Sequence, residues 1–542
     1  MESVSRAFLC KAAAITAVIC FITLAVYRLF FHPLARFPGP KLAAVTRWYE
    51  AYYDVVKDGQ YTFQIAKMHK KYGEPYNRSS PSVTSPRREL NPSRQHQLIL
   101  SNLGPIIRIS PEELHINDST YFEKLFRYEG RWNKYPWSID AQNAHGAIIF
   151  TADHDQHKAR RQPLNAYFSK ARVASRQAIV RSKVDKLESR IADDFADIGR
   201  RVDVGAFISA FIRDVSTDFV LGKDYRSLDQ DDFGVGMTHF VQGGGKMWRL
   251  TKHFPWYGPA MLSIPKDFLI KNADADTANY IRYAKASGEE TERLLKAAAS
   301  SPIDDDDAPT IVHEIVKSSL PPEDKTAKRV FADVATVTGA GFESTASVLR
   351  LLIYNVYSKP DILRRLRAEL AQATSSNPTG DLNLAALEQL PYLTAVILEA
   401  MRLSPALGTR LQRIAPDRDL VYNQWVIPAG TPVGMTTIFM HMDERLYPRP
   451  QHFEPERWAD PQAQKKAEKV YAPFSRGGRI CLGMHLAWAD MYFLVAALVQ
   501  RFDFDFGNVP QNHFEFVSDQ FIIGTRGKAI LEGFVTHRKD GR

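Results

Sequence analysis

The chain has 542 residues, of which 45% are apolar and 24% are charged, and its formal net charge is +9 at pH 7. Such values describe globular material with enough apolar side chains for a large core. The basic residues are dispersed, without a helix-turn-helix or zinc-finger pattern, so we expect no nucleic-acid partner. Three cysteines, Cys10, Cys20 and Cys481, exclude a disulfide framework and a four-cysteine metal site.

The N-terminus predicts a membrane anchor over residues 1–31. Sixteen uncharged residues separate Lys11 from Arg28, and apolar flanks lengthen this stretch to about 25 residues, enough to cross a bilayer. A cleaved signal peptide is the alternative, but no Ala-x-Ala-like cleavage site is present. Basic residues after the span outnumber those before it, which places the body in the cytosol.

Prolines in residues 32–41 predict a semi-rigid hinge, followed by a catalytic body over 42–542. Residues 74–103 are rich in Ser, Pro and Arg without periodicity, which predicts a disordered insertion, with a retained intron as the alternative. Around it, "KMHKKYG" and "GPIIRISPEELHI" indicate a helix end and a β-hairpin. Ser300–Thr310 is expected to be a solvated acidic loop.

Most of the body shows helical periodicity, as in Lys325–Ser358, Asp361–Thr374 and Pro391–Leu403. Short strands are expected only in the N-terminal hairpin and in Arg410–Thr437. The predicted fold class is mainly α with a minor β-sheet.

The stretch "PFSRGGRICLGMHLAWAD" places Cys481 in a loop of glycines and arginines before an apolar helix. An inert buried thiol would not need those glycines, and for a nucleophile His485 is the one local base. Glycines let a flat ligand approach the backbone, and the start of a helix stabilises a thiolate. A lone thiolate facing a planar group suits the axial ligand of haem iron.

"FSRGGRICLG" resembles the haem loop of the cytochrome P450 family at five positions: Phe474, Gly477, Arg479, Cys481 and Gly483. The resemblance implies the P450 fold, here preceded by a single transmembrane helix, and a bound haem b. It makes Cys481 the thiolate ligand of the iron and the other four residues part of the cofactor site.

Other motifs follow in the family's order. "EAMR" and "FEPERW" resemble the family's buried structural cluster, which implies that Glu399, Arg402 and Arg457 come together. "HDQHKARR" resembles the helix that binds the haem propionates, with Arg161 in its Arg place. His157 departs from the pattern because the family usually has Trp there. Arg413 resembles a further propionate partner.

"VTGAGFESTASVLRLL" has two glycines inside a helical stretch, at a cost of about 1 kcal/mol each against alanine. One interpretation is a notch for helix packing. The other rests on resemblance to the family's oxygen-activation motif, which implies proton delivery by Glu343 and Ser344. Thr345 follows directly, so which hydroxyl serves is left open, with Ser344 favoured by alignment.

The resemblance implies a haem-thiolate monooxygenase that hydroxylates or epoxidises an apolar small molecule with O2. Electrons from NADPH would arrive through NADPH-cytochrome P450 reductase, with cytochrome b5 as a second donor, at the endoplasmic reticulum membrane. Fungal trichodiene-oxygenase-like members are the most similar in pattern, which favours a terpenoid substrate. The alternatives are a P450-fold isomerase or dehydratase, and a membrane-anchored haem sensor or electron carrier. Specificity is expected to depend on the loops "NKYPWSIDAQNAHG" and "VQGGGKMWRL".

Overall fold

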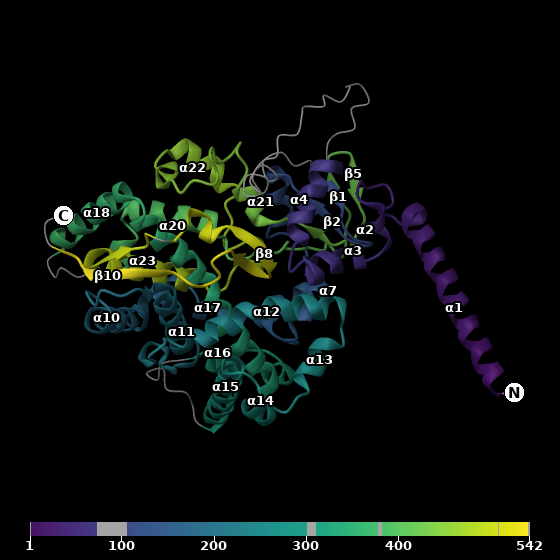
Figure 1. The fold of residues 1–542 in the computed structure, drawn as a ribbon, viewed down its shortest axis with the longest axis horizontal. Coiled ribbons are helices and arrows are strands. Elements are labelled where there is room, and N and C mark those ends of the chain that lie inside the picture. The colour runs from purple at the N-terminus through teal and green to yellow at the C-terminus, as the bar shows by residue number, and fades with distance from the viewer. Residues whose placement is uncertain (1, 73–105, 301–309, 378–381, 508, 540–542) are drawn as a thin grey trace.

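The computed structural model describes residues 2–72, 106–300, 310–377, 382–507 and 509–539. Within them, helices dominate and small sheets lie among them (Figure 1). The mainly α fold with a minor β component is therefore confirmed. The expected insertion, 74–103, lies outside the described residues, as does nearly all of the expected acidic loop.

The N-terminal helix α1 (Glu2–Val26) projects away from the body in Figure 1 and runs into a π-helical turn, η1 (Tyr27–Phe31). Residues Phe8–Phe31 are long and apolar enough to cross a membrane, with a mean hydropathy of 2.3 and none of that stretch buried. At its end, Arg28 Nη2 lies 3.3 Å from Glu112 Oε1 of the body. Leu34 and Phe37 of the proline-rich segment are buried against the first sheet.

The first sheet confirms the predicted hairpin. Strand β1 (Ile106–Arg108) pairs antiparallel with β2 (Leu114–Ile116), which pairs in parallel with β6 (Val433–Gly434). A second hairpin joins β4 (Leu420–Tyr422) and β5 (Trp425–Ile427). Short helical segments precede and follow these strands: α2 (Lys41–Val45), α3 (Trp48–Ala51), η2 (Tyr52–Val56), α4 (Tyr61–Tyr72), α6 (Phe122–Leu125), α7 (Pro136–Ile139) and α21 (Thr437–His441).

The main core lies between long helices, with α11 packed along α17 at its centre (Figure 1). The apolar residues of α17 repeat with helical period on several faces, which buries it in the core. The helices of this part are α8 (His154–Tyr167), α9 (Lys170–Ser175), α10 (Gln177–Asp194), α11 (Val204–Leu221), α12 (Val235–His253), α13 (Tyr257–Leu262), α14 (Lys266–Asn272), α15 (Ala275–Ser300), α16 (Ile311–Lys317), α17 (Ala327–Tyr357), α18 (Pro360–Ser376), α19 (Leu384–Leu387), α20 (Pro391–Leu403), α22 (Pro461–Glu468) and α23 (Met484–Arg501).

The expectation that strands are confined to two regions is wrong. The C-terminal part adds β7 (Phe502–Asp505), β8 (Phe516–Gln520), β9 (Ile522–Thr525) and β10 (Glu532–His537). Strand β10 pairs with β7 and with β3 (Val202–Asp203), about which the local pattern says nothing because the partners lie far apart in sequence. In β7, apolar Phe502 and Phe504 alternate with aspartates, as expected for a strand. This short pattern is hard to recognise in the sequence because an apolar helix directly precedes it.

The stretch "VQGGGKMWRL" is not a loop, because it forms the second half of α12. Gly245 is buried against Gln520, and a Cβ there would lie 2.5 Å from the Gln520 Oε1 atom. Gly243 and Gly244 are exposed, and an added Cβ would meet nothing within 4 Å. Of these three glycines, only Gly245 therefore stands where a side chain would clash with its neighbours.

Buried charges fasten the end of α12 to the segment formed by α3 and η2. Lys252 Nζ lies 2.6 Å from Asp54 Oδ2 and 3.3 Å from Glu50 Oε1. His253 Nε2 lies 3.2 Å from Asp54, and Arg410 Nη2 lies 2.8 Å from Glu50. Burial alone would raise the pKa of Asp54, but Lys252 and His253 hold it well below its usual value. We call Glu50, Asp54, Lys252, His253 and Arg410 the ionic clasp.

Candidate active site

The loop before α23 is held by its own backbone. The Cys481 N–H donates to the Phe474 carbonyl at 2.9 Å, and the Ile480 N–H donates to the Gly477 carbonyl at 3.0 Å. Gly477 has φ +70°, and a Cβ there would lie 2.6 Å from the carbonyl oxygens of Phe126 and Arg127. Only glycine fits at this position, and the loop is thereby pressed against the preceding chain.

The thiol of Cys481 remains accessible although protein surrounds it. Its side chain is exposed, yet burial among surrounding atoms raises its pKa, which the Gly483 N–H and Arg161 partly offset. Exposure and a pKa raised by burial are compatible when protein surrounds the sulfur on all sides but one. At Gly478 and Gly483, an added Cβ would meet nothing within 4 Å. The loop thus presents a thiol beside two positions without side chains, a surface that suits a flat ligand.

The predicted propionate-binding residues gather near this loop. Arg479 is buried and donates to the carbonyls of Thr151 at 2.6 Å and Ala152 at 2.8 Å, while its Nε atom has no partner in the part of the chain that the structure describes. From α8, Arg161 Nη1 donates to the Ile480 carbonyl at 2.6 Å. Arg413 is buried, and its nearest side-chain acceptor is Ser475 Oγ at 3.5 Å.

Basic side chains predominate in this region, although Asp153 partly offsets the effect of burial on Arg479. Burial, and then the neighbouring cations, lower the pKa of His157 to about 2 and that of Arg479 to about 9. Burial alone lowers the pKa of Arg413 to about 10. His157 is therefore neutral, and a neutral imidazole can still donate one hydrogen bond.

Lys134 belongs to the same cluster, although no local sequence pattern marks it as a site residue. Its Nζ donates to the Ile149 carbonyl at 2.5 Å, and burial followed by Arg479, Arg413 and Arg161 lowers its pKa well below its usual value. Within the described residues, none of these four basic side chains forms an ion pair. Arg413 and Arg479 are buried, and buried cations without anions are costly, so the donor set fits a ligand with two carboxylates, as haem has.

The helix α17 presents one open face in its middle. Ala340 is exposed and Ser344 is partly exposed, four residues apart and thus on the same side. Ser344 Oγ donates to the Ala340 carbonyl at 2.7 Å. Gly341 packs against α11, where a Cβ would lie 2.6 Å from Ser216 Oγ, whereas Gly339 faces open space. The packing interpretation thus fits Gly341, and the open-space interpretation fits Gly339.

Glu343 and Thr345 point elsewhere. Glu343 is buried, with Oε2 at 2.5 Å from Arg350 Nη2 and at 3.4 Å from Gln242 Nε2 of α12. Arg350 also donates to Ser209 Oγ of α11 at 2.7 Å. Thr345 is buried on a further side of the helix. Of the three predicted catalytic residues, Ser344 is the one that the structure places on the open face.

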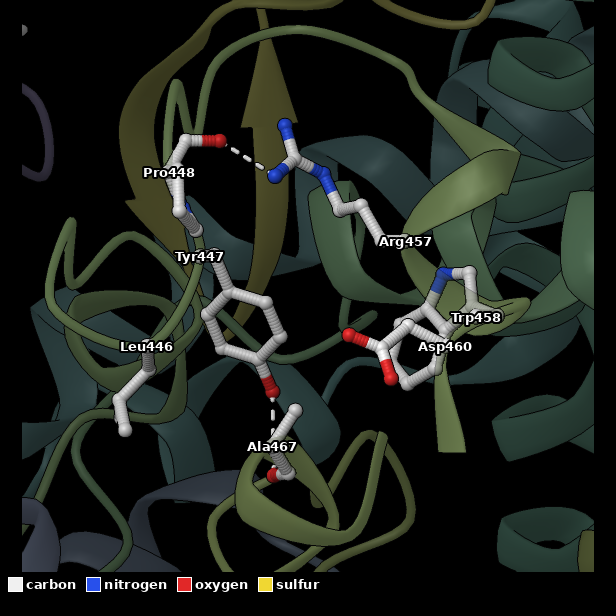
Figure 2. A pocket seen from close by; sticks show the side chains of 7 residues that line it. All are labelled: Leu446, Tyr447, Pro448, Arg457, Trp458, Asp460 and Ala467. Atoms are coloured by element: carbon white, nitrogen blue, oxygen red, sulfur yellow. Dashed lines mark hydrogen bonds between the residues drawn. The ribbon is translucent and has the colours of Figure 1, made fainter. Parts of the chain in front are cut away.

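The predicted structural cluster is assembled. Arg402 binds both carboxylate oxygens of Glu399, at 2.8 and 2.9 Å, and Arg457 Nε lies 3.1 Å from Glu399 Oε1. A pocket of about 230 Å³ lies beside it. In Figure 2, Arg457 donates to the Pro448 carbonyl and the Tyr447 hydroxyl donates to the Ala467 carbonyl. This pocket is separate from the cysteine loop, since it contains none of the loop's residues.

The family model for cytochrome P450 matches residues 104–527. The chain belongs to the cytochrome P450 family. A tryptophan 6-hydroxylase of Fusarium equiseti is 34% identical over 93% of this chain and 92% of its own length. A cytochrome P450 monooxygenase of Cochliobolus heterostrophus is 35% identical over 88% of this chain and 85% of its own. An N-acetyltryptophan 6-hydroxylase of Emericella nidulans is 34% identical over 92% of this chain and 91% of its own.

Family membership makes the protein a monooxygenase of the haem-thiolate type. Members bind haem through a cysteine-derived thiolate and need a redox partner and a small-molecule substrate. The exposed Cys481 thiol, the side-chain-free Gly478 and Gly483 and the unpaired basic cluster fit that cofactor.

Proposed function

We propose that this enzyme hydroxylates or epoxidises an apolar small molecule of fungal secondary metabolism, a terpenoid or a related compound. The observation that carries the proposal is the Cys481 thiol between Gly478 and Gly483, beside basic side chains that form no ion pair among the described residues. An electron carrier would need no open face on a core helix, which Ala340 and Ser344 provide here.

Each site residue has a proposed role. Cys481 ligates the iron, in the loop that Phe474, Gly477 and Gly483 shape. Arg161, Arg413 and Arg479 bind the haem carboxylates as cations, and neutral His157 donates a hydrogen bond. Haem, when bound, supplies the activation of O2 for insertion into a C–H bond or an alkene. Glu399, Arg402 and Arg457 stabilise the fold around the loop.

Proton delivery is assigned to the Ser344 hydroxyl, since it is the one on the open face of α17. Glu343 lies about 100° around the helix from it and is ion-paired with Arg350. Its carboxylate therefore acts from a distance, through intervening water. Thr345, being buried, is the weaker candidate.

The protein is proposed to be anchored in the endoplasmic reticulum membrane by residues 1–31, with 32–41 as the hinge and 42–542 as the cytosolic catalytic domain. Exposed apolar side chains continue from the anchor onto the body, which supports attachment at more than one point. They are Trp48, Tyr52 and Val56 near α3, and Trp256, Leu262 and Phe268 around α13 and α14. NADPH-cytochrome P450 reductase, and cytochrome b5 as a second donor, would supply electrons from the same membrane.

The substrate is tested with a panel of terpenoids together with tryptophan and N-acetyltryptophan, on which two relatives act by their names. Full-length enzyme is screened for substrate-induced spectral shifts, then incubated with reductase and NADPH. A terpenoid product one oxygen atom heavier is the expected result. Turnover of tryptophan or N-acetyltryptophan alone would contradict the terpenoid proposal and assign an indole substrate instead. Reversible reduction without any product would favour an electron carrier.

A further inference from the structure

A short helical turn, η5 (Ile148–Phe150), lies in the segment that joins α17 to the cysteine loop. At its start, the Ile148 N–H donates to Asp333 Oδ1 of α17 at 2.6 Å. Directly after the turn, the Thr151 carbonyl accepts a hydrogen bond from Arg479 of the cysteine loop, also at 2.6 Å. The segment is therefore attached to α17 at one end and to the cysteine loop at the other.

Asp333 lies on the same side of α17 as the open face. It precedes Ala340 by seven residues and Ser344 by eleven, so both lie within about 20° of it around the helix axis. Asp333 is buried, whereas Ala340 is exposed and Ser344 is partly exposed. The turn η5 thus covers this side of α17 at Asp333, and the same side becomes accessible two to three helical turns further on.

Four side chains of alternating charge hold the turn in place. Arg329 Nη1 lies 2.6 Å from Asp333 Oδ2, and Arg329 Nε lies 3.6 Å from Asp324 Oδ1. Arg160 Nη2 of α8 lies 2.6 Å from the same Asp324 oxygen, and Arg160 also donates to the Thr151 hydroxyl at 3.1 Å. None of the four charged side chains is more than 11% exposed. Buried ion pairs of this kind are strongly destabilised when one partner is removed, so they restrict the movement of η5.

The side chains that the turn carries are apolar and only partly buried. Ile149 and Phe150 keep accessible surface although the segment is attached at both ends. The Phe150 ring lies 6.4 Å from that of Phe521, the residue between β8 and β9. Accessible apolar and aromatic side chains at fixed positions are typical of small-molecule binding sites.

We propose that Asp333 is a positioning residue: by accepting the bond from Ile148, it holds the apolar side chains of η5 as a wall against the bound substrate. The inference rests on the proposed site at Cys481 and adds how one side of the substrate-binding region is built. Burial raises the pKa of Asp333, but Oδ1 accepts from the Ile148 N–H whether or not the other oxygen carries a proton.

The test uses imidazole and 4-phenylimidazole, which bind haem iron through a ring nitrogen, so no native substrate is needed. Both are titrated into the holoenzyme and followed by the shift of the Soret band. The phenyl group adds apolar contact, and each contact of methylene size is worth about fourfold in affinity. Asp333→Ala should therefore reduce the preference for 4-phenylimidazole over imidazole by about fourfold or more, with the imidazole affinity close to that of wild type.

Three variants serve as controls. Asp333→Asn keeps the Oδ1 acceptor and should restore most of the preference. Asp214→Ala is the matched control, because buried Asp214 of α11 also accepts two backbone bonds, from Ser227 and Leu228 at 2.7 and 2.9 Å, and holds η6 (Ser227–Asp229) rather than η5. It should leave the preference unchanged even where it lowers stability. Asp333→Ser, whose hydroxyl is too short for the bond to Ile148, replaces Asp333→Ala if that variant does not retain haem.

An unchanged preference in Asp333→Ala, or an equal weakening of both ligands, would overturn the proposal, because a purely structural role does not distinguish the two ligands. An equal loss of preference in Asp214→Ala would overturn it as well. The carbonyl spectrum of wild type tests the proposed site separately. Without a thiolate-type spectrum the assignment of Cys481 fails, whereas a thiolate-type spectrum with an unchanged preference refutes the role of Asp333 alone.

Discussion

Replacing Lys252 by methionine tests the ionic clasp between α12 and the segment of α3 and η2. The change keeps most of the side-chain volume but leaves the carboxylates of Glu50 and Asp54, which are 1% and 3% exposed as side chains, without their shared cation. Removing one partner of a buried ion pair costs about 3–5 kcal/mol. Arg410 still neutralises Glu50 and His253 still contacts Asp54, so we expect a loss of about 3 kcal/mol, the lower end of that range.

The assay is urea-induced unfolding of the holoenzyme, followed by tryptophan fluorescence and by the haem spectrum. Lys285→Met is the matched control, because Lys285 forms an exposed pair with Asp267 at 3.1 Å, a type worth at most about 1 kcal/mol. The clasp variant should unfold at clearly lower urea than the control. Equal midpoints for the two variants would refute the reasoning.

The pH dependence gives an independent check. In wild type, the pKa of Asp54 is lower in the folded than in the unfolded protein. Its stabilising contribution is therefore complete above the unfolded value of about 3.9 and is lost as the pH falls through the folded value. Without Lys252, burial dominates and the folded pKa of Asp54 rises above the unfolded value. The stability difference between variant and wild type should then shrink as the pH falls from 7 towards 4.

Three further outcomes are expected. Cys481→Ser should abolish the thiolate-type carbonyl spectrum and all turnover, and a variant that kept this spectrum would end the haem-thiolate assignment. Deleting residues 1–31 should release much of the protein from membranes with haem bound, as fractionation and absorbance would show; a truncated protein unable to bind haem would make the segment part of the fold. Ser344→Ala should raise the peroxide formed per NADPH consumed more than Thr345→Ala does, and the reverse order would assign the hydroxyl role to Thr345.

Local motifs were enough to predict those parts of the site whose residues lie close together in the sequence. The cysteine loop is held by backbone hydrogen bonds from Cys481 to Phe474 and from Ile480 to Gly477, all within a few residues. Glu399 and Arg402 are likewise one helical turn apart. The β1–β2 hairpin was predictable for the same reason. Such features depend on spacing, which the sequence states directly.

Other features depend on contacts between distant segments. Lys134 joins the basic cluster through backbone bonds to Ala152, and Lys252 meets Asp54 across almost two hundred residues. No local pattern marks either lysine. Arg350 is different, because a residue seven positions after Glu343 returns to nearly the same face of the helix. That partner was predictable from a spacing of two turns.

The three glycines of α12 divide that helix into parts with different attachments. After the glycines, Lys252 and His253 contact Asp54, a clasp residue that follows the N-terminal anchor closely in sequence. Before the glycines, Gln242 contacts Glu343 on α17. Each glycine weakens a helix by about 1 kcal/mol relative to alanine, and Gly243 and Gly244 add no packing in return. The backbone hydrogen bonds around them therefore break at a lower free energy than those of either flank. We therefore expect amide protons at this point to exchange with solvent before those of either flank, and the two halves of α12 to fluctuate independently, one with the segment of α3 and η2 and the other with α17.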